Sequence, residues 1–374
     1  MTWQTKKLDD ACEVEYGTRV VNKKHGGSKY PVYGGGGATF FMDRSNRKDR
    51  MVIARFAMSE QCTRFVSGEF FLNDSGLTLS PKNNSEIAQD FLNWEVLFLN
   101  DHIYSLARGS AQKNLDVPAF RKMVITYPNS IAEQKRIVKK LNEVFEKVAT
   151  AKANAEKNLQ NPKELFESYL QSVFAKPGKD WEEKKLVEVC ELKSGTTIPL
   201  KLEKQSGDVL YVKVGDMNLV GNEIEITTSS RFINSSVLNH KQIIPQGSVI
   251  FPKRGGAIFT NKRRKIIKPT IVDLNTMALV PSELIDSDLL YYWFLRIDLR
   301  DLNNGSSIPQ INNYSFDNVL ISYPKSLSEQ KAIVKKLNTL SEETKKLEKI
   351  YEQKLADLEE LKKSVLSKAF HVEL

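Results

Sequence analysis

Metal-binding and reactive side chains are scarce in this chain of 374 residues. It has three cysteines and four histidines, and no two cysteines form a C-x-x-C pair. A zinc cage needs ligands at close spacing, and a disulfide framework needs more cysteines than three, which is also an odd number, so we expect neither. Cys12 and Cys190 lie in segments where apolar residues alternate, so we expect them to be buried thiols. No metal site is expected in this chain.

Long apolar runs are also lacking. No run approaches the roughly 18 residues that a membrane-spanning helix needs, and no secretory leader opens the sequence. The net charge is +9 at pH 7, and both halves of the chain are positive. This sign favours a polyanionic partner, although an ordinary basic protein is the simpler alternative. We expect a cytoplasmic protein without a membrane partner.

Familiar catalytic motifs are missing as well. The glycine run 34–37 is not followed by Lys-Ser/Thr at the start of a helix, and the sequence has no G-x-S-x-G or H-E-x-x-H motif. Glu133 with Lys135, and Glu329 with Lys331, resemble one part of a metal-dependent nuclease site, but no upstream Pro-Asp accompanies them. We therefore expect no catalytic residue, and keep DNA cleavage through these two pairs as a disfavoured alternative.

What the chain does contain is the same segment twice. Residues 133–142 and 329–338 agree at nine of ten positions, 196 residues apart. The openings of the two halves also correspond, from Trp3 and Trp181 onward, but at an offset of 178, so the second copy has 18 more residues in its middle. This period is too long for a solenoid repeat and indicates a duplicated domain, which favours a partner that also comes in two copies.

Each repeated segment is predicted to open a long helix. Ser130 with Glu133, and Ser326 with Glu329, have the spacing of a capping box, and apolar residues then step by four and three, as in a coiled coil. A helix of about 44 residues is roughly 66 Å long, which exceeds the width of a domain of this size. We therefore expect the two helices to pack antiparallel on each other rather than each on its own domain alone. The expected seam positions are Ile137, Leu141, Val144, Val148, Leu170 and Phe174 in the first helix, and Ile333, Leu337, Leu340, Leu347, Leu366 and Phe370 in the second.

Two irregularities are expected in these helices. Pro162 should bend or break the first, because proline lacks the amide that the helix needs and its ring clashes with the preceding turn. The second helix has Leu347, Tyr351, Leu355 and Leu358 at steps of four, four and three. This spacing predicts a stutter in its heptads.

The centres of the two halves differ, and basic side chains gather in both. Short apolar runs beside Gly-Thr steps predict mixed α/β domains with irregular sheets, and Arg-rich loops with interleaved glycine favour contacts with a phosphate backbone. A solvated charged surface is the alternative. The candidate DNA-binding cations are Arg44, Arg47, Lys48, Arg50, Arg55 and Arg64 in the first half, and Lys253, Arg254, Lys262, Arg263, Arg264 and Lys265 in the second.

Two polar loops lie at equivalent places in the halves, beginning at Gly109-Ser110 and Gly305-Ser306. Gln112, Asn114 and Gln310 in these loops are suited to adenine edges in the major groove, and plain turn chemistry is an equal alternative.

The combination resembles a known family, the DNA-specificity (S) subunits of type I restriction-modification systems, over the whole chain. The resemblance is carried by the Trp-x-x-x-Lys-Leu openings at Trp3 and Trp181, the Gly-Ser loops at Gly109 and Gly305, the Glu-Gln-x-x-Ile-Val segments after Pro128 and Pro324, and the helix ends 168–174 and 364–370. It implies an α+β chain with two mixed α/β target-recognition domains in tandem, 1–128 and 179–324. Two conserved helical spacers, 129–178 and 325–374, would form an antiparallel intramolecular coiled coil with a pseudo-twofold axis.

The resemblance also implies a function. Each target-recognition domain would read one half of a split double-stranded DNA site, while the chain itself would be non-catalytic and bind no cofactor. The repeated helices would recruit two methyltransferase subunits that use S-adenosylmethionine, and the family also allows a restriction subunit that uses ATP and magnesium. We expect charge reversal at Arg263 and Arg264 to weaken DNA binding without affecting assembly.

The main alternative is a coiled-coil interaction protein whose basic domains bind RNA or another acidic partner. Against it stands the combination of nearly identical helices with divergent basic centres, because that layout suits exchangeable readers on a common frame.

Overall fold

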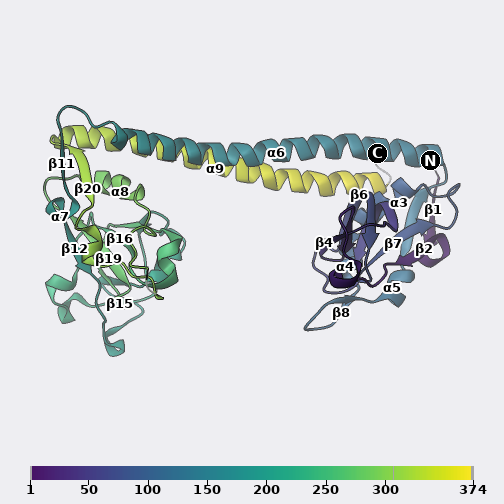
Figure 1. The fold of residues 1–374 in the computed structure, drawn as a ribbon, viewed down its shortest axis with the longest axis horizontal. Coiled ribbons are helices and arrows are strands. Elements are labelled where there is room, and N and C mark those ends of the chain that lie inside the picture. Colours follow the sequence, from purple (N-terminus) through teal and green to yellow (C-terminus); the bar gives the residue numbers. More distant parts are fainter. Residues whose placement is uncertain (1, 306, 372–374) are drawn as a thin grey trace. The chain divides into compact units, whose positions relative to one another are not determined.

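The computed structural model describes residues 2–305 and 307–371 and divides into two compact units. Unit 1 comprises residues 1–157 and 351–374, and unit 2 comprises residues 158–350. Each unit combines a mixed α/β domain with one segment of each long helix, α6 (Ile131–Ala175) and α9 (Leu327–Phe370) (Figure 1). The predicted fold class is confirmed, whereas the division into four segments stays a prediction.

Unit 1 contains a six-stranded sheet with the order β2-β7-β5-β6-β3-β4, in which only β3 and β6 are parallel. Its strands are β2 (Cys12–Tyr16), β3 (Tyr30–Gly34), β4 (Gly37–Met42), β5 (Arg47–Ala54), β6 (Thr63–Leu72) and β7 (Gly76–Pro81). Two further ladders pair β1 (Trp3–Lys7) with β10 (Val124–Pro128), and β8 (Ala107–Arg108) with β9 (Asn114–Leu115). The short helices are α1 (Leu8–Ala11), α2 (Asn22–His25), α3 (Gln89–Phe98), α4 (Asn100–Ser105) and α5 (Val117–Arg121).

The core of unit 1 joins the sheet to both long helices. Phe91 of α3 is fully buried, and its ring lies 5.3 Å from that of Phe370 in α9. Leu141 of α6 is buried in the same apolar cluster. The α6 and α9 segments run antiparallel here, since Lys152 forms an ion pair with Glu359 while Leu141 and Phe370 share the core. Burial of these large side chains is the main source of stability for the junction.

Unit 2 contains a five-stranded sheet of order β12-β19-β16-β17-β14 and a three-stranded sheet of order β15-β13-β18. The strands are β12 (Cys190–Ser194), β13 (Val209–Val212), β14 (Glu225–Ile226), β15 (Phe232–Ile233), β16 (Val249–Pro252), β17 (Arg264–Ile266), β18 (Thr270–Val272) and β19 (Thr276–Pro281). β11 (Trp181–Lys185) pairs with β20 (Leu320–Pro324), and the α-helices of this domain are α7 (Leu186–Val189) and α8 (Ser287–Leu295). Short 3-10 segments are η1 (Leu200–Leu202), η2 (Val214–Asn218), η3 (Ser235–Val237), η4 (His240–Gln242), η5 (Gly255–Thr260) and η6 (Asn313–Phe316).

The duplication is visible in the strand registers. Trp3 pairs with Pro128 and Trp181 with Pro324, and the next ladder starts with Cys12 opposite Pro81 and Cys190 opposite Pro281. Both thiols are buried as predicted, and burial raises the pKa of Cys12 and of Cys190 to about 12. They therefore behave as small core side chains rather than as reactive groups.

The repeated Gly-Thr step has a steric reason. A Cβ atom on Gly17 would lie 1.7 Å from the carbonyl oxygen of Asn73, and one on Gly195 would lie 1.9 Å from that of Asp273. Distances this short exclude any side chain, so glycine lets β2 and β12 approach the turn that precedes β7 and β19.

Helix α6 continues through Pro162, so the predicted break does not occur, while the alternative, a bend at Pro162, stays a prediction. The buried positions Leu141, Val148, Ala155 and Pro162 recur every seven residues, which places the proline ring within the apolar seam. Packing around that ring favours a continuous helix despite the missing amide.

The stutter predicted in α9 is also wrong. Leu337, Thr344, Tyr351 and Leu358 recur at intervals of seven on the less exposed side of the helix, and Glu348 and Lys362 are half-buried on the same side. Leu347 lies outside this seam and is 42% exposed, which corrects its predicted place in the coiled coil. The other expected seam residues are buried or half-buried. Long polar side chains can cover a seam with their methylene groups, so the leucine pattern alone misidentified the register.

The predicted capping boxes form only in part. The amide of Glu133 lies 3.4 Å from Ser130 Oγ, but the Glu133 carboxylate pairs with Arg136. Glu329 instead accepts a hydrogen bond from Trp181 Nε1 at 3.2 Å. Within residues 2–305 and 307–371, no helix is both long and apolar enough to cross a membrane.

Candidate nucleic-acid interface

A cationic residue follows the central strand of the unit 1 sheet. β5 ends at Ala54, and the amide of Arg55 then donates to the carbonyl of Ser75 at 2.9 Å. The carbonyl of Arg55 accepts from the amide of Leu115 at 2.8 Å, so the Gly109 loop is joined to this point. The backbone of Arg55 is therefore fixed on both sides.

Lys253 has the same place in unit 2. It follows β16, its amide donates to the carbonyl of Asn275 at 2.8 Å, and its carbonyl accepts from Ile311 at 2.9 Å. Arg55 and Lys253 are thus equivalent residues on one repeated backbone frame. This is the strongest basis for a paired site in the two units.

The side-chain partners at this place differ between the units. The Arg55 guanidinium lies 4.7 Å from the ring centres of both Tyr16 and Phe56, and its Nη1 donates to the carbonyl of Asp74 at 2.9 Å. Tyr16 and Phe56 are 42% and 40% exposed, so an ordered cation with two aromatic neighbours reaches the surface. Stacking between rings restricts a guanidinium and presents its donors in a fixed plane.

In unit 2, Lys253 Nζ donates to Ser194 Oγ at 3.0 Å. Ser194 ends β12 just as Tyr16 ends β2, and burial together with the neighbouring Arg254 lowers the pKa of Lys253. Arg254 is exposed, as is Phe259 of η5. We call these two equivalent places, built around Arg55 with Tyr16 and around Lys253 with Ser194, the reader edges.

The polar residues of the loops beside the reader edges form hydrogen bonds within the fold. Asn114 Oδ1 accepts from the amide of Ala57 at 3.2 Å, where Ala57 has a left-handed φ of 48°, and Gln112 donates to the same oxygen at 3.3 Å. The backbone of Gln310 forms a bridge with Arg254, and its amide donates to Asn304 Oδ1 at 3.2 Å. Turn chemistry therefore accounts for part of the pattern, although Gln112 is exposed. Ser306 lies outside the described residues.

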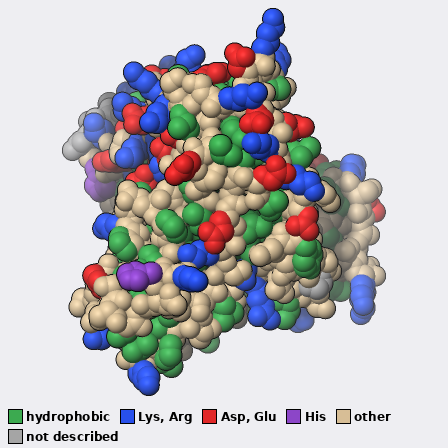
Figure 2. All heavy atoms as spheres, turned by 90° about the vertical axis from the view of Figure 1, so that its left-hand side faces the viewer, with side chains coloured by type: hydrophobic (Ala, Val, Ile, Leu, Met, Phe, Trp, Pro, Cys, Tyr) green, Lys and Arg blue, Asp and Glu red, His purple; other side chains and the backbone are tan. Residues whose placement is uncertain are grey.

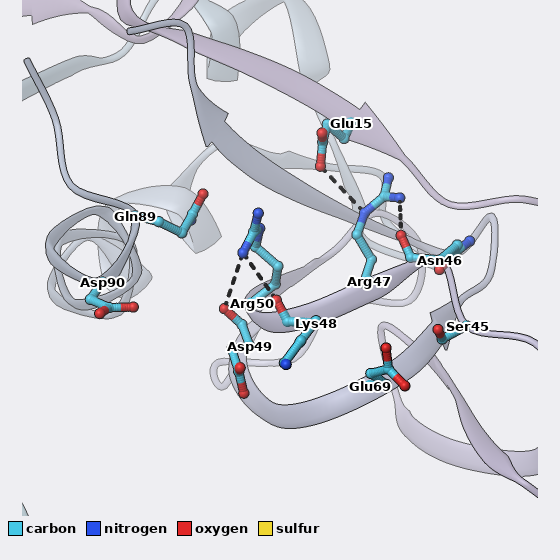
Figure 3. A pocket seen from close by; sticks show the side chains of 10 residues that line it. All are labelled: Glu15, Ser45, Asn46, Arg47, Lys48, Asp49, Arg50, Glu69, Gln89 and Asp90. Carbon is cyan, nitrogen blue, oxygen red and sulfur yellow. Dashed lines mark hydrogen bonds and ion pairs between the residues drawn. The ribbon is translucent and has the colours of Figure 1, made fainter. Parts of the chain in front are cut away.

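Three of the predicted cations in unit 1, Arg47, Lys48 and Arg50, line a cleft of about 600 Å³ (Figure 3). Arg47 donates to Thr78 Oγ1 at 2.8 Å and lies 3.3 Å from Glu15, while Arg50 Nη1 points at backbone carbonyls. Carboxylates line the same cleft, from Glu15, Asp49, Glu69 and Asp90. This mixture of charges does not favour a phosphate. Arg47 and Arg50 are therefore better explained as parts of the fold, whereas Lys48 is exposed.

Arg44 and Arg64 are more accessible. Arg44 is exposed beside the ring of Phe71, with 5.6 Å between its guanidinium carbon and the ring centre. Arg64 is also exposed and lies against Gly37, where any Cβ would come within 2.5 Å of its Nη1.

The basic run of unit 2 is largely internal. Arg263 is 3% exposed, its guanidinium lies over the ring of Phe294, and burial lowers its pKa to about 10. Arg264 donates to the carbonyls of Arg263 and Met217, and Lys262 Nζ donates to Asn218. Lys265 forms ion pairs with Glu225 and Asp288, at 2.9 Å each.

The burial of Arg263 in the core argues against the expectation that charge reversal at Arg263 and Arg264 weakens DNA binding alone, and that expectation stays a prediction. Figure 2, which faces unit 2, shows basic and acidic side chains interspersed on that surface. Among the cations predicted in this unit, Arg254 is exposed.

The long helices present a different surface. In unit 2 a groove of about 660 Å³ is lined by Leu165, Tyr169, Leu340 and Ala332, with Lys335 and Lys336 among its other residues. Leu165 is 62% exposed. Over residues 2–305 and 307–371, no group of three or more His, Cys, Asp and Glu side chains has an arrangement that could hold a metal ion.

A family model described as "Type I restriction modification DNA specificity domain" matches residues 1–160 and 178–357. The chain belongs to this family. Each half contains one copy of the specificity domain, and the predicted membership of the specificity-subunit family is confirmed. The family assignment agrees with the repeated frame of the two units.

Two specificity subunits of Methanocaldococcus jannaschii are similar to this one. The MjaVIII specificity subunit is 26% identical over 80% of this chain and 75% of its own length. The MjaIX specificity subunit is 25% identical over 47% of this chain and 42% of its own, so that match spans less than half of the relative.

Two solved structures show the same fold. One, titled as the structural basis of assembly and conformational transition of the type I R-M system, has a TM-score of 0.80 at 17% identity and covers 100% of this chain and 98% of its own. The HsdS subunit from Thermoanaerobacter tengcongensis has a TM-score of 0.59 at 18% identity, with 100% and 97% covered.

The sequence did not single out Tyr16, Phe56 or Ser194 at the reader edges. The sequence does contain a signal for two of these residues. Tyr16 and Ser194 immediately precede the two Gly-Thr steps, and one is aromatic while the other is a small hydroxyl residue.

Proposed function

We propose that this specificity subunit reads a two-part DNA site, with one half contacted by each reader edge, and that it has no catalysis of its own. The supporting observation is that Arg55 and Lys253 have the same backbone anchors, while their side-chain neighbours are Tyr16 in one unit and Ser194 in the other. Equal frames with unequal side chains suit two different half-sites.

The chemistry of the edges supports base reading. A guanidinium ordered by two rings can donate two hydrogen bonds to O6 and N7 of guanine, and the exposed edge of Phe56 suits a thymine methyl group. At the reader edge of unit 2, the Lys253 ammonium lies beside the Ser194 hydroxyl. An ammonium is a compact cation and can make fewer fixed hydrogen bonds to a base than a guanidinium can. The two edges should therefore prefer different bases.

Exposed cations near the edges are suited to phosphates. Arg44 and Arg64 in unit 1 and Arg254 in unit 2 have accessible guanidinium groups, whereas Arg47, Arg263 and Lys265 are engaged within the fold. Phosphate contacts of this kind fix the register of a protein on the duplex and make its affinity depend on salt.

The repeated helices are the surface proposed for the modification subunits. The apolar groove beside Leu165 and Tyr169, with Lys335 at its rim, is suited to an apolar helix or loop that carries acidic residues. S-adenosylmethionine would be bound by those subunits, and ATP with magnesium by any restriction subunit, so this chain needs neither.

The test exchanges the two edges in the complex with the modification subunits. The double variant Tyr16→Ser/Arg55→Lys gives unit 1 the side chains of unit 2, and mapping of methylated adenines in genomic DNA reports the site. We expect the half-site read by unit 1 to change and the other half to stay. Asp10→Asn, which changes an exposed acid on α1, is the control and should leave both halves unchanged.

A change in both half-sites, or in neither, would contradict independent reading by the two edges. Binding of the unmodified complex to RNA in preference to duplex DNA would support the interaction-protein alternative instead.

A further inference from the structure

The two units share a second equivalent place, where the domain meets the long helix. Asn142 Oδ1 of α6 accepts from Trp94 Nε1 of α3 at 3.1 Å. In unit 2, Asn338 Oδ1 of α9 accepts from Tyr292 Oη of α8 at 2.6 Å. An aspartate lies one turn earlier on each domain helix, Asp90 on α3 and Asp288 on α8. The same aromatic–asparagine contact therefore stands beside an aspartate in both units.

In unit 2 a lysine of the same chain lies at this place and lines a cavity of about 400 Å³. Lys265 Nζ lies 2.9 Å from Asp288 Oδ1 and 2.9 Å from Glu225 Oε1, and it lies 5.7 Å from the ring centre of Tyr291. Its side chain is mostly buried. In unit 2 the group between the Asp288 carboxylate and the aromatic ring of Tyr291 is thus a lysine ammonium.

In unit 1 an aromatic residue has the sheet position of that lysine. Lys265 pairs with Val249 across β16 and β17, and Phe65 pairs with Met51 across the equivalent strands β5 and β6. Phe65 is 49% exposed. Phe65 carries no charge. Unit 1 therefore has no cation of its own at the position that Lys265 occupies in unit 2.

A cavity of about 340 Å³ is found there. Its walls include Phe65, Trp94, Leu97 and Val138, and its polar lining includes Asp49 and Asp90. A cavity of this size accommodates one long side chain, with apolar walls for the methylene groups and carboxylates for the charged end.

The carboxylates of this cavity have few partners. Asp49 Oδ1 accepts from the amide of Gly68 at 2.7 Å, and among the described residues no Lys or Arg forms an ion pair with Asp90. Arg50 lines the adjoining cleft with Asp90, but its Nη1 donates to the carbonyl of Lys48 at 3.0 Å (Figure 3). A position in the first turn of α3 favours an acidic residue in any case, yet Asp288 has the same kind of position and still binds Lys265.

We propose that this cavity receives a lysine or arginine side chain of the modification subunit that docks on unit 1. The inference rests on the proposed function for the identity of that partner. A cation between Asp90 and the rings of Phe65 and Trp94 would repeat the arrangement of Lys265 in unit 2 and add contacts that a desolvated cation makes with aromatic faces. Unit 2 has a cavity of about 400 Å³ at the equivalent place, but its own Lys265 lines that cavity and pairs with Asp288 and Glu225, so the two docking sites are chemically different.

The experiment counts modification subunits bound to the full chain over a range of concentrations by native mass spectrometry. Asp90→Asn should weaken the binding of one of the two copies about tenfold or more and leave the other unchanged. Phe65→Lys, which supplies an internal cation as unit 2 does, should weaken the same copy and raise the thermal midpoint of the chain. Asp101→Asn, an exposed acid on α4, is the matched control and should bind both copies normally.

Binding of both copies by Asp90→Asn within twofold of the unmodified chain would overturn the proposal. If Phe65→Lys failed to fold, the Asp90→Asn measurement would decide alone, because that change is nearly isosteric. A different failure is also recognisable: if the unmodified chain recruited no modification subunit, the proposed function itself would be wrong.

Discussion

The side chain of Gln134 donates from Nε2 to the carbonyl of Pro128 at 2.9 Å, which joins the first turn of α6 to the strand that precedes it. Nε2 of Gln134 also donates to the backbone carbonyl of Glu86 at 2.8 Å, and its Oε1 accepts from the amide of Ala88 at 2.8 Å. Gln330 makes the corresponding contacts in unit 2 and, like Gln134, has no exposed surface. The glutamine of the repeated segment therefore anchors each helix to its own domain.

We predict that Gln134→Leu destabilises unit 1 by about 2–4 kcal/mol, because backbone groups that are buried lose their partners. Urea unfolding of the full chain measures this loss, and Gln330→Leu should give a similar loss in unit 2. Gln160→Leu, on an exposed site of α6, is the control and should change stability by less than about 0.5 kcal/mol. Equal effects of Gln134→Leu and the control would argue against the anchoring role.

We predict that substitution of Arg263 lowers the stability of unit 2, whereas substitution of Arg254 lowers the affinity for DNA. Arg263→Glu would bury a carboxylate against Phe294 and should destabilise unit 2 by about 3–5 kcal/mol, detectable as a lower urea midpoint. Arg254→Ala should leave folding intact and weaken DNA binding, with the salt dependence reduced by about one phosphate contact. A folded Arg263→Glu protein with normal stability would contradict the burial of this guanidinium.

The stability of unit 1 should depend on pH through Glu95. This carboxyl is buried, its Oε1 accepts from the amide of Thr126 at 2.6 Å, and burial raises its pKa from 4.5 to about 8. Since the folded pKa is raised, the contribution of Glu95 to stability is fully present below about pH 4.5. It falls as the pH rises to about 8, by roughly 1.4 kcal/mol per pH unit.

Glu95→Gln keeps the shape of the side chain but cannot ionise, so it should remove this slope. The check is urea unfolding of the full chain at several values between pH 5 and 8. Glu60→Gln, an exposed acid in the loop before β6, serves as the comparison. Equal slopes in the unmodified chain and Glu95→Gln would show that another group carries the dependence.

Pro162 offers a stabilising change. Proline in a helix interior costs roughly 3 kcal/mol relative to alanine, and here the helix continues through it. Pro162→Ala restores a backbone hydrogen bond but removes buried atoms, so we predict a net gain of about 1–2 kcal/mol in thermal or urea unfolding. Pro177→Ala, beyond the end of α6, should have little effect. A loss of stability in Pro162→Ala would mean that packing of the ring outweighs the missing bond.

Much of the frame could be predicted from the sequence because it follows from local identities. The repeated segments place the helix starts beside Ser130 and Ser326, and the matching Trp and Cys positions carry the same strand registers. Side-chain exposure could not be obtained in this way. Arg254 and Arg263 belong to the same basic run, yet one is exposed and the other stacks in the core, since exposure depends on which strand and helix lie opposite.

The predicted register of α9 is wrong for a related reason. The apolar pattern predicts Leu347 in the seam of α9, but Leu347 faces outward, and the half-buried Glu348 and Lys362 lie in the seam instead. The reader edges were missed because Tyr16 and Phe56 meet Arg55 through a turn and a sheet, contacts that no short-range pattern contains.

Unit 1 is completed by the far end of the chain, since Leu366, Ala369 and Phe370 fill its core beside Phe91. During translation the first domain must therefore wait for residues 158–370, which takes on the order of 10–40 s at about 5–20 residues per second. Until then its rings stay uncovered, and a nascent or prematurely terminated product would be prone to aggregation and to capture by chaperones. Only a polypeptide synthesised through α9 can bury them, which couples the integrity of the first domain to the synthesis of α9.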